Sequence, residues 1–558
     1  MAALTTAAPL SGSVQQVRAL AAAAPSELSK SPLLGILGVI TGAGIVTLTG
    51  RMITLGLPDL KGHLGISFDD GAWISSAYNI ALMFMGPLTV YLGGLFGPRR
   101  ILLVSATGFT LICGLLPFIH NYSLLITALV IAGLTSGTFY PLTLTFALRN
   151  IPLRFLPFTL AFYATFVDMG VNIAPTLYGW YRDYLSWHWM FWNSALITPL
   201  MMACIYWGIP ASPAPKRSSG APSFAGLLYA GAAFGMFFAV LDQGERLDWW
   251  RSGTITALAI GGGLLLLATM VQRLRGPNPL VDLQFLLRRN TLLSGSALIL
   301  FRFCLLATII LVPQSLSVHG FEADQIGPAV VWVAVPQLAV ACIAALLLLR
   351  RIDSRLLVAI GFVCMAFASC LNASYTSSWA AENYYGSELL MAIGQSFAFI
   401  GLVGTIILNA VISGAMAKPS AVLTYSAYFH LVRLLGGELG ASFMAHFIAA
   451  REKLHSNLLG LHVQSGSWIT DGSLHSLTAG VLDKSSGIAA ASGRALGLVS
   501  GRIRLQAYTL TFIDGFYLIA GACVLALLVI ALIRRFPFSY GDLGAFQEIQ
   551  APQQDGEK

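Results

Sequence analysis

Six ionisable side chains stand out within the long apolar stretches of this 558-residue chain. On membrane-insertion scales such a group costs about 2.5–3.5 kcal/mol at the centre of a span, so it is rare and usually functional. The structural alternative is a permanent ion pair that pins helices together. The six residues, three of them near the middle of their stretches, are Arg51, Asp168, Arg302, His430, Arg433 and Glu438.

These residue types allow proton-coupled chemistry. A carboxyl group shielded from water holds its proton more tightly, so Asp168 is the first candidate for a proton carrier and Glu438 the second. Arginine does not release its proton. Arg51, Arg302 and Arg433, with His430 on the same helical face as Arg433, are therefore expected to bind an anion or pair with the acids. Proton and substrate would then compete for one electrostatic site.

The elements that carry these residues are apolar stretches long enough to cross a membrane. The chain is 56% hydrophobic and 10% charged, whereas soluble domains carry about 25% charge. The sequence therefore predicts an all-α integral membrane protein with 14 transmembrane helices. The expected spans are 32–56, 71–95, 100–120, 123–148, 155–181, 187–209, 222–243, 253–273, 291–313, 326–349, 356–376, 386–413, 421–449 and 510–533.

Basic residues set the expected orientation. Most Lys and Arg fall in short loops on one side, and the short loops of the other side hold only Lys61, Arg182, Arg246 and Arg251. The basic side faces the cytoplasm, which predicts cytoplasmic termini, with a disordered tail at 1–31 and a cytoplasmic tail at 541–558. The charge is spread over these loops, so no nucleic-acid surface is expected. Catalytic, nucleotide-binding and metal motifs are missing, which predicts no enzyme activity, no cofactor and no metal.

The outer side carries one long segment, 451–508, between the last two spans. The spacing of Leu454, Leu458 and Leu461, and of Leu496, Val499 and Ile503, predicts two amphipathic helical pieces. The segment is either a solvated loop or a docking platform for a protein on the outer side. Three acids at outer span ends are expected simply to reach into water; they are Asp242, Glu245 and Asp514.

Several short motifs, taken together, resemble the major facilitator superfamily, in particular its fourteen-span drug:proton antiporters typified by EmrB and QacA. They are Leu-Pro at 57–58, Ala-Trp-Ile-Ser-Ser-Ala-Tyr at 72–78, Gly-Gly-Leu-Phe-Gly-Pro-Arg-Arg at 93–100, Ala-Pro-Thr-Leu-Tyr-Gly at 174–179, Ser-Trp-His-Trp-Met-Phe-Trp-Asn at 186–193, Asp-Gln-Gly-Glu-Arg-Leu-Asp-Trp-Trp at 242–250 and Arg-Leu-Leu-Gly-Gly-Glu-Leu-Gly at 433–440. The resemblance implies two six-helix bundles, an inserted central helix pair and alternating access by rocking of the bundles.

The chain departs from the family pattern at charged positions. The acid expected before Gly97, Arg99 and Arg100 is missing, and Thr49 stands at the position of the acid in the first span. Leu129 and Ala132 precede Gly133, where relatives carry Arg and Gln. The antiporter motif is half kept: Asp168, Asn172, Pro175 and Gly179 share one helical face. Such a face most often packs against a neighbouring span, and the resemblance implies that it lines a gate between the bundles. Gly133, Gly436 and Gly437 are further conformational positions of the family motifs.

The resemblance also places a set of residues along the central pathway. A wide apolar cavity with few polar groups suits amphiphilic compounds, although an aromatic stripe is more often ordinary helix packing. The expected cavity residues are Trp73, Tyr78, Asn79, Phe139, Tyr140, Tyr163, Phe166, Gln395 and Asn409.

The sequence favours a proton-coupled exporter of hydrophobic or amphiphilic compounds, with membrane lipid, protons and a small-molecule substrate as partners. A periplasmic adaptor is a further expected partner, in the inner membrane of a two-membrane envelope. A facilitator or uptake symporter of an organic anion and a non-transporting scaffold remain alternatives. The expected organisation is an N-terminal bundle over 32–210, a linker and central pair over 211–275, and a C-terminal bundle over 276–540 that contains 451–508.

Overall fold

Long helices make up nearly all of the described chain in the computed structural model, which covers residues 32–150, 156–209, 224–275, 287–350, 352–412, 419–464, 466–536 and 540. The tails at 1–31 and 541–558 and most of the linker after 210 lie outside these residues. No β-strand occurs within the ranges described. The α-helices are α2 (Pro32–Leu55), α3 (Leu57–Leu64), α4 (Phe68–Phe96), α5 (Pro98–Leu115), α6 (Tyr122–Ser136), α7 (Phe139–Asn150), α8 (Leu156–Tyr184), α9 (Trp189–Gly208), α10 (Phe224–Gly244), α11 (Gly253–Arg275), α13 (Arg289–Cys304), α14 (Val312–Val318), α15 (Ala323–Ala334), α16 (Pro336–Leu349), α17 (Ser354–Asn372), α18 (Ala381–Ile412), α19 (Pro419–Gly460), α20 (Trp468–Val481) and α21 (Ile488–Leu532).

Twelve helical stretches in the described chain are long and apolar enough to cross a membrane. Two further helices, α4 with 29 residues and α9 with 20, are also long, although they are not among these twelve. They lie among the spanning helices, because α4 packs against α6 and α10 while α9 packs against α2 and α5. With these two helices the described chain is consistent with the expected fourteen spans, and the all-α architecture predicted from the sequence is confirmed.

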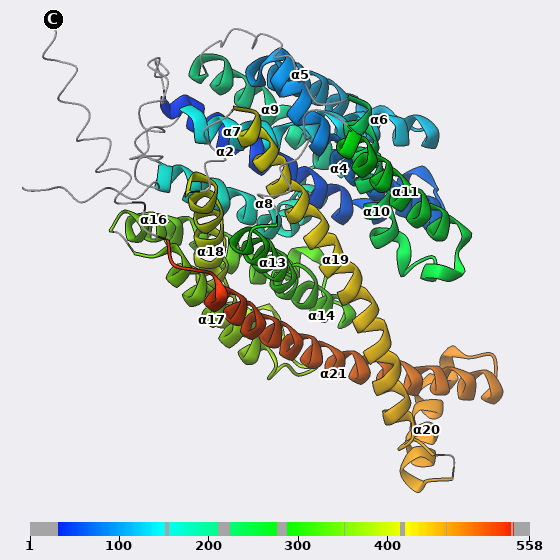
Figure 1. Cartoon of the computed structure of the whole chain (residues 1–558). Helices are drawn as coiled ribbons and strands as arrows, with labels where there is room; N and C mark the ends of the chain where they lie inside the picture. The colour runs from blue at the N-terminus through cyan, green and yellow to red at the C-terminus, as the bar shows by residue number, and fades with distance from the viewer. Residues whose placement is uncertain are drawn as a thin grey trace, which may run out of the picture.

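The helices form two bundles with an extra pair beside them (Figure 1). Helices α2 to α9 make the N-terminal bundle, and α13 to α19 with α21 make the C-terminal bundle. In the inserted pair, α10 packs against α4 of the first bundle and α19 of the second, and α11 packs against α10. Helix α8 faces α15, α16 and α18 across the boundary, so it forms much of the contact between the bundles.

Local sequence explains where several spans begin. Ser67 accepts a hydrogen bond from the backbone N–H of Asp70 and caps α4, and Asn121 caps α6 in the same way through Leu124 N–H. Gly97 separates α4 from α5 at a φ of +85°, a left-handed conformation that glycine adopts without strain. Pro98 then starts α5, where its missing N–H costs nothing.

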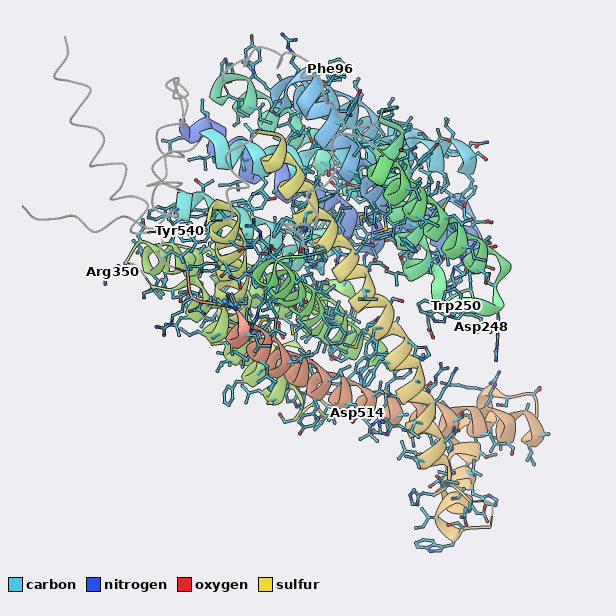
Figure 2. The ribbon with its side chains drawn as sticks, in the orientation of Figure 1. Phe96, Asp248, Trp250, Arg350, Asp514 and Tyr540 are labelled. Carbon is cyan, nitrogen blue, oxygen red and sulfur yellow. The ribbon has the colours of Figure 1, made fainter. Side chains whose placement is uncertain are left out.

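The two ends of the bundles differ in charge. Phe96 and Arg350 lie at one end, and Asp248 and Trp250 at the opposite end (Figure 2). We call the end with Asp248 the outer end, following the orientation expected from the basic loops.

The segment 451–508 extends the membrane helices and is not a loop. Helix α19 continues to Gly460, α21 begins at Ile488, and α20 lies between them (Figure 1). The predicted helical pieces are present, but their leucines do not pack together: Leu458 is 49% exposed, and Leu454, Leu461 and Leu496 are exposed as well. Small residues of α21, such as Ala491, are buried instead. We call residues 456–503 the outer protrusion.

Candidate functional site

Buried ionisable groups from both bundles meet at the boundary between them. Asp168 comes from the middle of α8 in the N-terminal bundle, and it is 1% exposed. Arg302 comes from α13, and His430 and Arg433 come from α19, all in the C-terminal bundle. The sequence places these groups deep in their spans, and the fold brings them into one cluster.

Asp168 has no direct partner in this arrangement. Neither carboxyl oxygen has a hydrogen-bond donor among the described residues. Arg302 and Arg433 interact with it electrostatically, yet neither forms an ion pair with it. Among the described residues, Asp168 is therefore not part of the ion pair that was the structural alternative. A buried carboxyl group without a donor has unmet hydrogen-bonding capacity, and a functional role is one physical explanation for such a group.

An aromatic residue holds Arg433. The guanidinium carbon of Arg433 lies 3.9 Å from the ring centroid of Tyr140 on α7. Tyr140 also packs against His430, at 5.3 Å between ring centroids, and edge-on against Tyr163, at 6.4 Å. Its hydroxyl is hydrogen bonded to that of Thr47 on α2. Part of the predicted aromatic set thus positions a cation at the boundary.

Glycine makes room for Arg302. A Cβ atom added at Gly437 of α19 would lie 3.0 Å from Arg302 Nη2 and 3.1 Å from Nε. One added at Gly436 would lie 3.0 Å from Cγ1 of Ile299, one turn earlier on α13. The Gly-Gly pair therefore lets α13 and α19 approach closely with the guanidinium between them.

A ring of neutral polar groups crosses the boundary beside Asp168. Asn172 of α8 donates to Gln395 of α18 at 2.9 Å and accepts from Thr308 at 3.3 Å. Gln395 donates to the Thr308 hydroxyl at 3.0 Å and accepts from Gln337 at 3.0 Å. Asn172, one residue of the predicted face of α8, therefore faces the other bundle. Thr308 and Gln337 escaped prediction because lone Thr and Gln residues in apolar spans carry no distinctive pattern.

Arg51 donates a hydrogen bond across the boundary between the bundles to the backbone carbonyl of Ile309. Pro313 occupies the position that would normally donate to this carbonyl in a helix. Pro313 has no N–H and cannot donate to the carbonyl of Ile309, four residues earlier. The chain before it is a π-helix over Ala307–Leu311, a form common at functional sites. Arg51 Nη2 of α2 donates to the Ile309 carbonyl at 2.7 Å.

Further contacts join the outer halves of the bundles. Thr176 Oγ1 donates to the carbonyl of Gly327 at 3.0 Å, and Arg182 Nη2 bonds Glu322 at 3.1 Å. A Cβ at Gly179 would lie 3.3 Å from the backbone of Ala323, so this glycine permits close approach. A cavity of about 170 Å³ lies in this region, and Pro175, Tyr178, Pro313 and Ile326 contribute to its lining. The bundles therefore touch at their outer side in this conformation.

Replacing Arg51 with Met should weaken this outer contact. The Ile309 carbonyl would lose its donor, and an unpaired buried polar group costs about 1–3 kcal/mol. We expect a cysteine introduced at Ile326 to react roughly 5- to 150-fold faster with an impermeant maleimide from the outer side. Arg251→Met, which removes an exposed arginine, should leave the rate unchanged. Equal rates in Arg51→Met and the parent would contradict a closing role.

Other predicted residues stay within one bundle. Tyr78 accepts from Ser136, Asn79 donates to the backbone of Ser75, and Asn409 donates to Thr291. Phe166 lies beside Gly44, Phe139 packs against Phe109, and Trp73 lies under Arg246 near the outer end. Their hydrogen bonds and ring contacts are those of packing, and they do not join the Asp168 cluster.

The conformational positions at the inner end and in the N-terminal bundle have local roles. Arg99 donates to the Tyr206 carbonyl at 2.8 Å, whereas Arg100 is exposed. A Cβ at Gly133 would lie 2.3 Å from the carbonyl oxygen of Tyr78, so only glycine allows α6 this close to α4.

Three acids differ from the sequence-based expectations. Glu388 of α18 is fully buried, and the donor it has among the described residues is Asn372, at 3.3 Å; it escaped prediction because it lies near the start of its span. Asp514 does not simply reach water, since Arg451 Nε bonds it at 2.7 Å and His455 at 2.7 Å. Glu245 bonds His446 at 2.9 Å and Trp249 at 3.0 Å.

Comparison with known proteins agrees with this architecture. The family model described as Major Facilitator Superfamily matches residues 39–441, more than half of the chain. The chain belongs to the Major Facilitator Superfamily. The chain of the human organic anion transporter MFSD10 has a similar fold, with a TM-score of 0.50 at 14% identity, covering 89% of this chain and 98% of that one. The structure of the proton:xylose symporter XylE also has a TM-score of 0.50 at 14% identity, and the match covers 92% of this chain and 98% of that one.

Several curated proteins are similar to this chain over most of its length. This transporter is 27% identical over 432 residues to the multidrug export protein EmrB of Haemophilus influenzae, covering 77% of this chain and 83% of the relative. It is 25% identical over 496 residues to the fatty acid resistance protein FarB of Neisseria gonorrhoeae, covering 88% and 93%. It is also 25% identical over 417 residues to the multidrug export protein EmrB of Escherichia coli K12, and the match covers 73% of this chain and 78% of the relative. These relatives are named as export or resistance proteins, and membership of the superfamily makes this chain a multi-pass membrane transporter and not an enzyme.

Proposed function

We propose that this transporter exports amphiphilic compounds in exchange for protons, and that Asp168 carries the coupled proton. The observation that carries the proposal is a buried, unpaired carboxyl group at the bundle boundary, with Arg302 and Arg433 close enough to act on it. Rocking of the bundles changes the distance between α8 and the arginines on α13 and α19. The charge state of Asp168 then depends on which side of the membrane is open.

The same cluster supports a preference for anionic substrates. Arg302 Nε and Nη1 and Arg433 Nε have no hydrogen-bond partner among the described residues. An acid group of a substrate can therefore occupy the place of the Asp168 carboxylate beside these cations. The relative FarB is named for resistance to fatty acids, which are anionic amphiphiles.

Replacing Arg302 with Gln should reduce transport of anionic amphiphiles more than that of cationic dyes. Loss of a charge-assisted hydrogen bond costs about 1.5–3 kcal/mol, which corresponds to a roughly 10- to 150-fold weaker apparent affinity for the anion. Flux in proteoliposomes under an imposed pH gradient measures both substrate classes. Arg251→Gln serves as the matched control. Equal losses for anions and cations would reject the anionic preference.

The outer protrusion supports a protein partner as part of this function. At its base, Arg451 and His455 of α19 bond Asp514 of α21, and Arg504 pairs with Glu452 at 3.4 Å. Such polar pairs are typical of the membrane edge. Beyond them Trp468 is 82% exposed and Ile488 74% exposed. Leu461, Ile469 and Leu496 of the protrusion are exposed as well. Exposed apolar side chains gathered on one segment mark an interaction surface, and we propose a helical periplasmic adaptor as the partner.

This proposal includes a location in the inner membrane with cytoplasmic termini, and boundaries for the bundles at 32–210 and 276–540 with 211–275 between them. An uptake symporter for an organic anion would use the same arginines. Cells lacking the protein would then accumulate less of the compound, whereas loss of an exporter makes them accumulate more. A scaffold would give no flux in proteoliposomes.

A further inference from the structure

Asp242 lies at a junction of helices near the outer end of the inserted pair. It accepts a hydrogen bond from Ser76 of α4, and another from its neighbour Gln243 at 2.8 Å. Gln243 Nε2 also donates to Ser76 Oγ at 2.6 Å. The sequence predicted that Asp242 would only reach into water, and that expectation is wrong. The carboxyl group is half-buried and held in one position by donors from two helices.

A second carboxyl group meets Asp242 at this junction. Glu438 of α19 is within side-chain hydrogen-bonding distance of Asp242. Two carboxylates offer only acceptors, so a contact between them needs a proton, and two like charges at this distance are not both ionised. The geometry points to a shared-proton pair between Asp242 and Glu438, through which the inserted helices take part in proton transfer between the outer side and the Asp168 cluster.

Polar groups connect the pair to the outer surface. Gln243 Oε1 accepts from Arg246 Nε at 2.6 Å, and Arg246 Nη1 bonds Asp69 of α4 at 2.5 Å. Asp69 is largely exposed, so this series begins in water. Glu245, the next acid outward, faces His446 of α19, with Lys453 also acting on it. Burial acts to raise the pKa of Glu245, but hydrogen bonds from Trp249 and His446 outweigh burial and lower this pKa. Glu245 therefore stays ionised.

On the inward side one cation links the pair to Asp168. Arg302 of α13 interacts electrostatically with Glu438 and also with Asp168. Ionisation of one acid therefore draws Arg302 towards it and away from the other. A proton that leaves the pair makes Glu438 the better partner for Arg302, and Asp168 then keeps its own proton. This role rests on the proposed exchange of substrate for protons, whereas the shared proton itself does not.

Infrared difference spectroscopy tests the shared proton without substrate or gradient. The reconstituted protein is titrated, and the carboxylic acid C=O band that disappears with rising pH is compared with that of Asp242→Asn and Glu438→Gln. Each variant leaves an amide that can donate to the remaining carboxylate, so the fold should be kept. We expect the same band to be missing from both variants and present in Asp248→Asn, which removes an exposed acid. Persistence of the band in either pair variant overturns the shared proton.

Transport tests the role of the pair. Asp242→Asn should reduce pH-driven export in proteoliposomes roughly 5-fold or more, while Asp248→Asn should export at the parental rate. Unreduced export by Asp242→Asn overturns the participation of the inserted helices. If the parent protein itself shows no pH-driven flux, the proposed exchange fails, and the participation of the inserted helices fails with it. In that case the infrared result still tests whether Asp242 and Glu438 share a proton, independently of transport.

Discussion

Replacing Asp168 with Asn will abolish pH-driven export while leaving the protein folded and able to bind its substrate. Asparagine has nearly the shape of aspartic acid but cannot take up or release a proton. The site contains no donor to Asp168 that the substitution would leave unpaired. Flux under an imposed pH gradient should fall to that of protein-free liposomes. Equilibrium binding of a fluorescent amphiphile should remain.

Two comparisons make this result specific. Asp483→Asn removes an exposed acid of the outer protrusion and should export at the parental rate in proteoliposomes. Counterflow, in which labelled and unlabelled substrate exchange without a net proton movement, should persist in Asp168→Asn. Undiminished gradient-driven flux in that variant would show that another group carries the proton, and Glu388 would then be the next buried acid to test.

Replacing residues 457–502 with a short Gly/Ser linker will abolish resistance in whole cells but not flux in proteoliposomes. The linker joins helices that are close together at this level, because Arg504 Nε of α21 lies 3.4 Å from Glu452 Oε1 of α19. The pairs with Asp514 that join the two helices are retained. Helix α21 extends roughly 39 Å from Asp514 to Ile488, at about 1.5 Å per residue. The deletion therefore removes the exposed apolar residues and spares the transport site.

Point variants separate docking from folding of the protrusion. Trp468→Ser and Ile488→Ser replace the most exposed large apolar side chains without shortening a helix. We expect a large loss of whole-cell resistance from the pair combined, with flux in proteoliposomes at the parental level. Crosslinking of the protrusion to an outer-side protein should be lost in parallel. Full resistance in the deletion variant would mean that the protrusion is a solvated connector and docks no adaptor.

Helical periodicity and hydropathy predict the spans of this protein, their order and the faces of individual helices from the sequence alone. The spans and their order follow from apolar length, and the common face of Asp168, Asn172, Pro175 and Gly179 follows from the helical repeat. That face does lie between the bundles, as the hydrogen bonds of Asn172 and the approach of Ala323 to Gly179 show. The depth of a charged residue in its span is likewise set by counting from the span ends.

Only the tertiary structure decided which of these residues meet. Counting along a helix gives the depth and face of a side chain but not the partner helix at that depth. The unpaired state of Asp168, the bond from Arg51 to the Ile309 carbonyl and the contact of Asp242 with Glu438 each join segments far apart in sequence. The exposure of Leu458 follows likewise from how α19 and α21 pack. The reason is physical: the helical repeat is local, whereas rotation and register between helices depend on close packing of every side chain in the boundary.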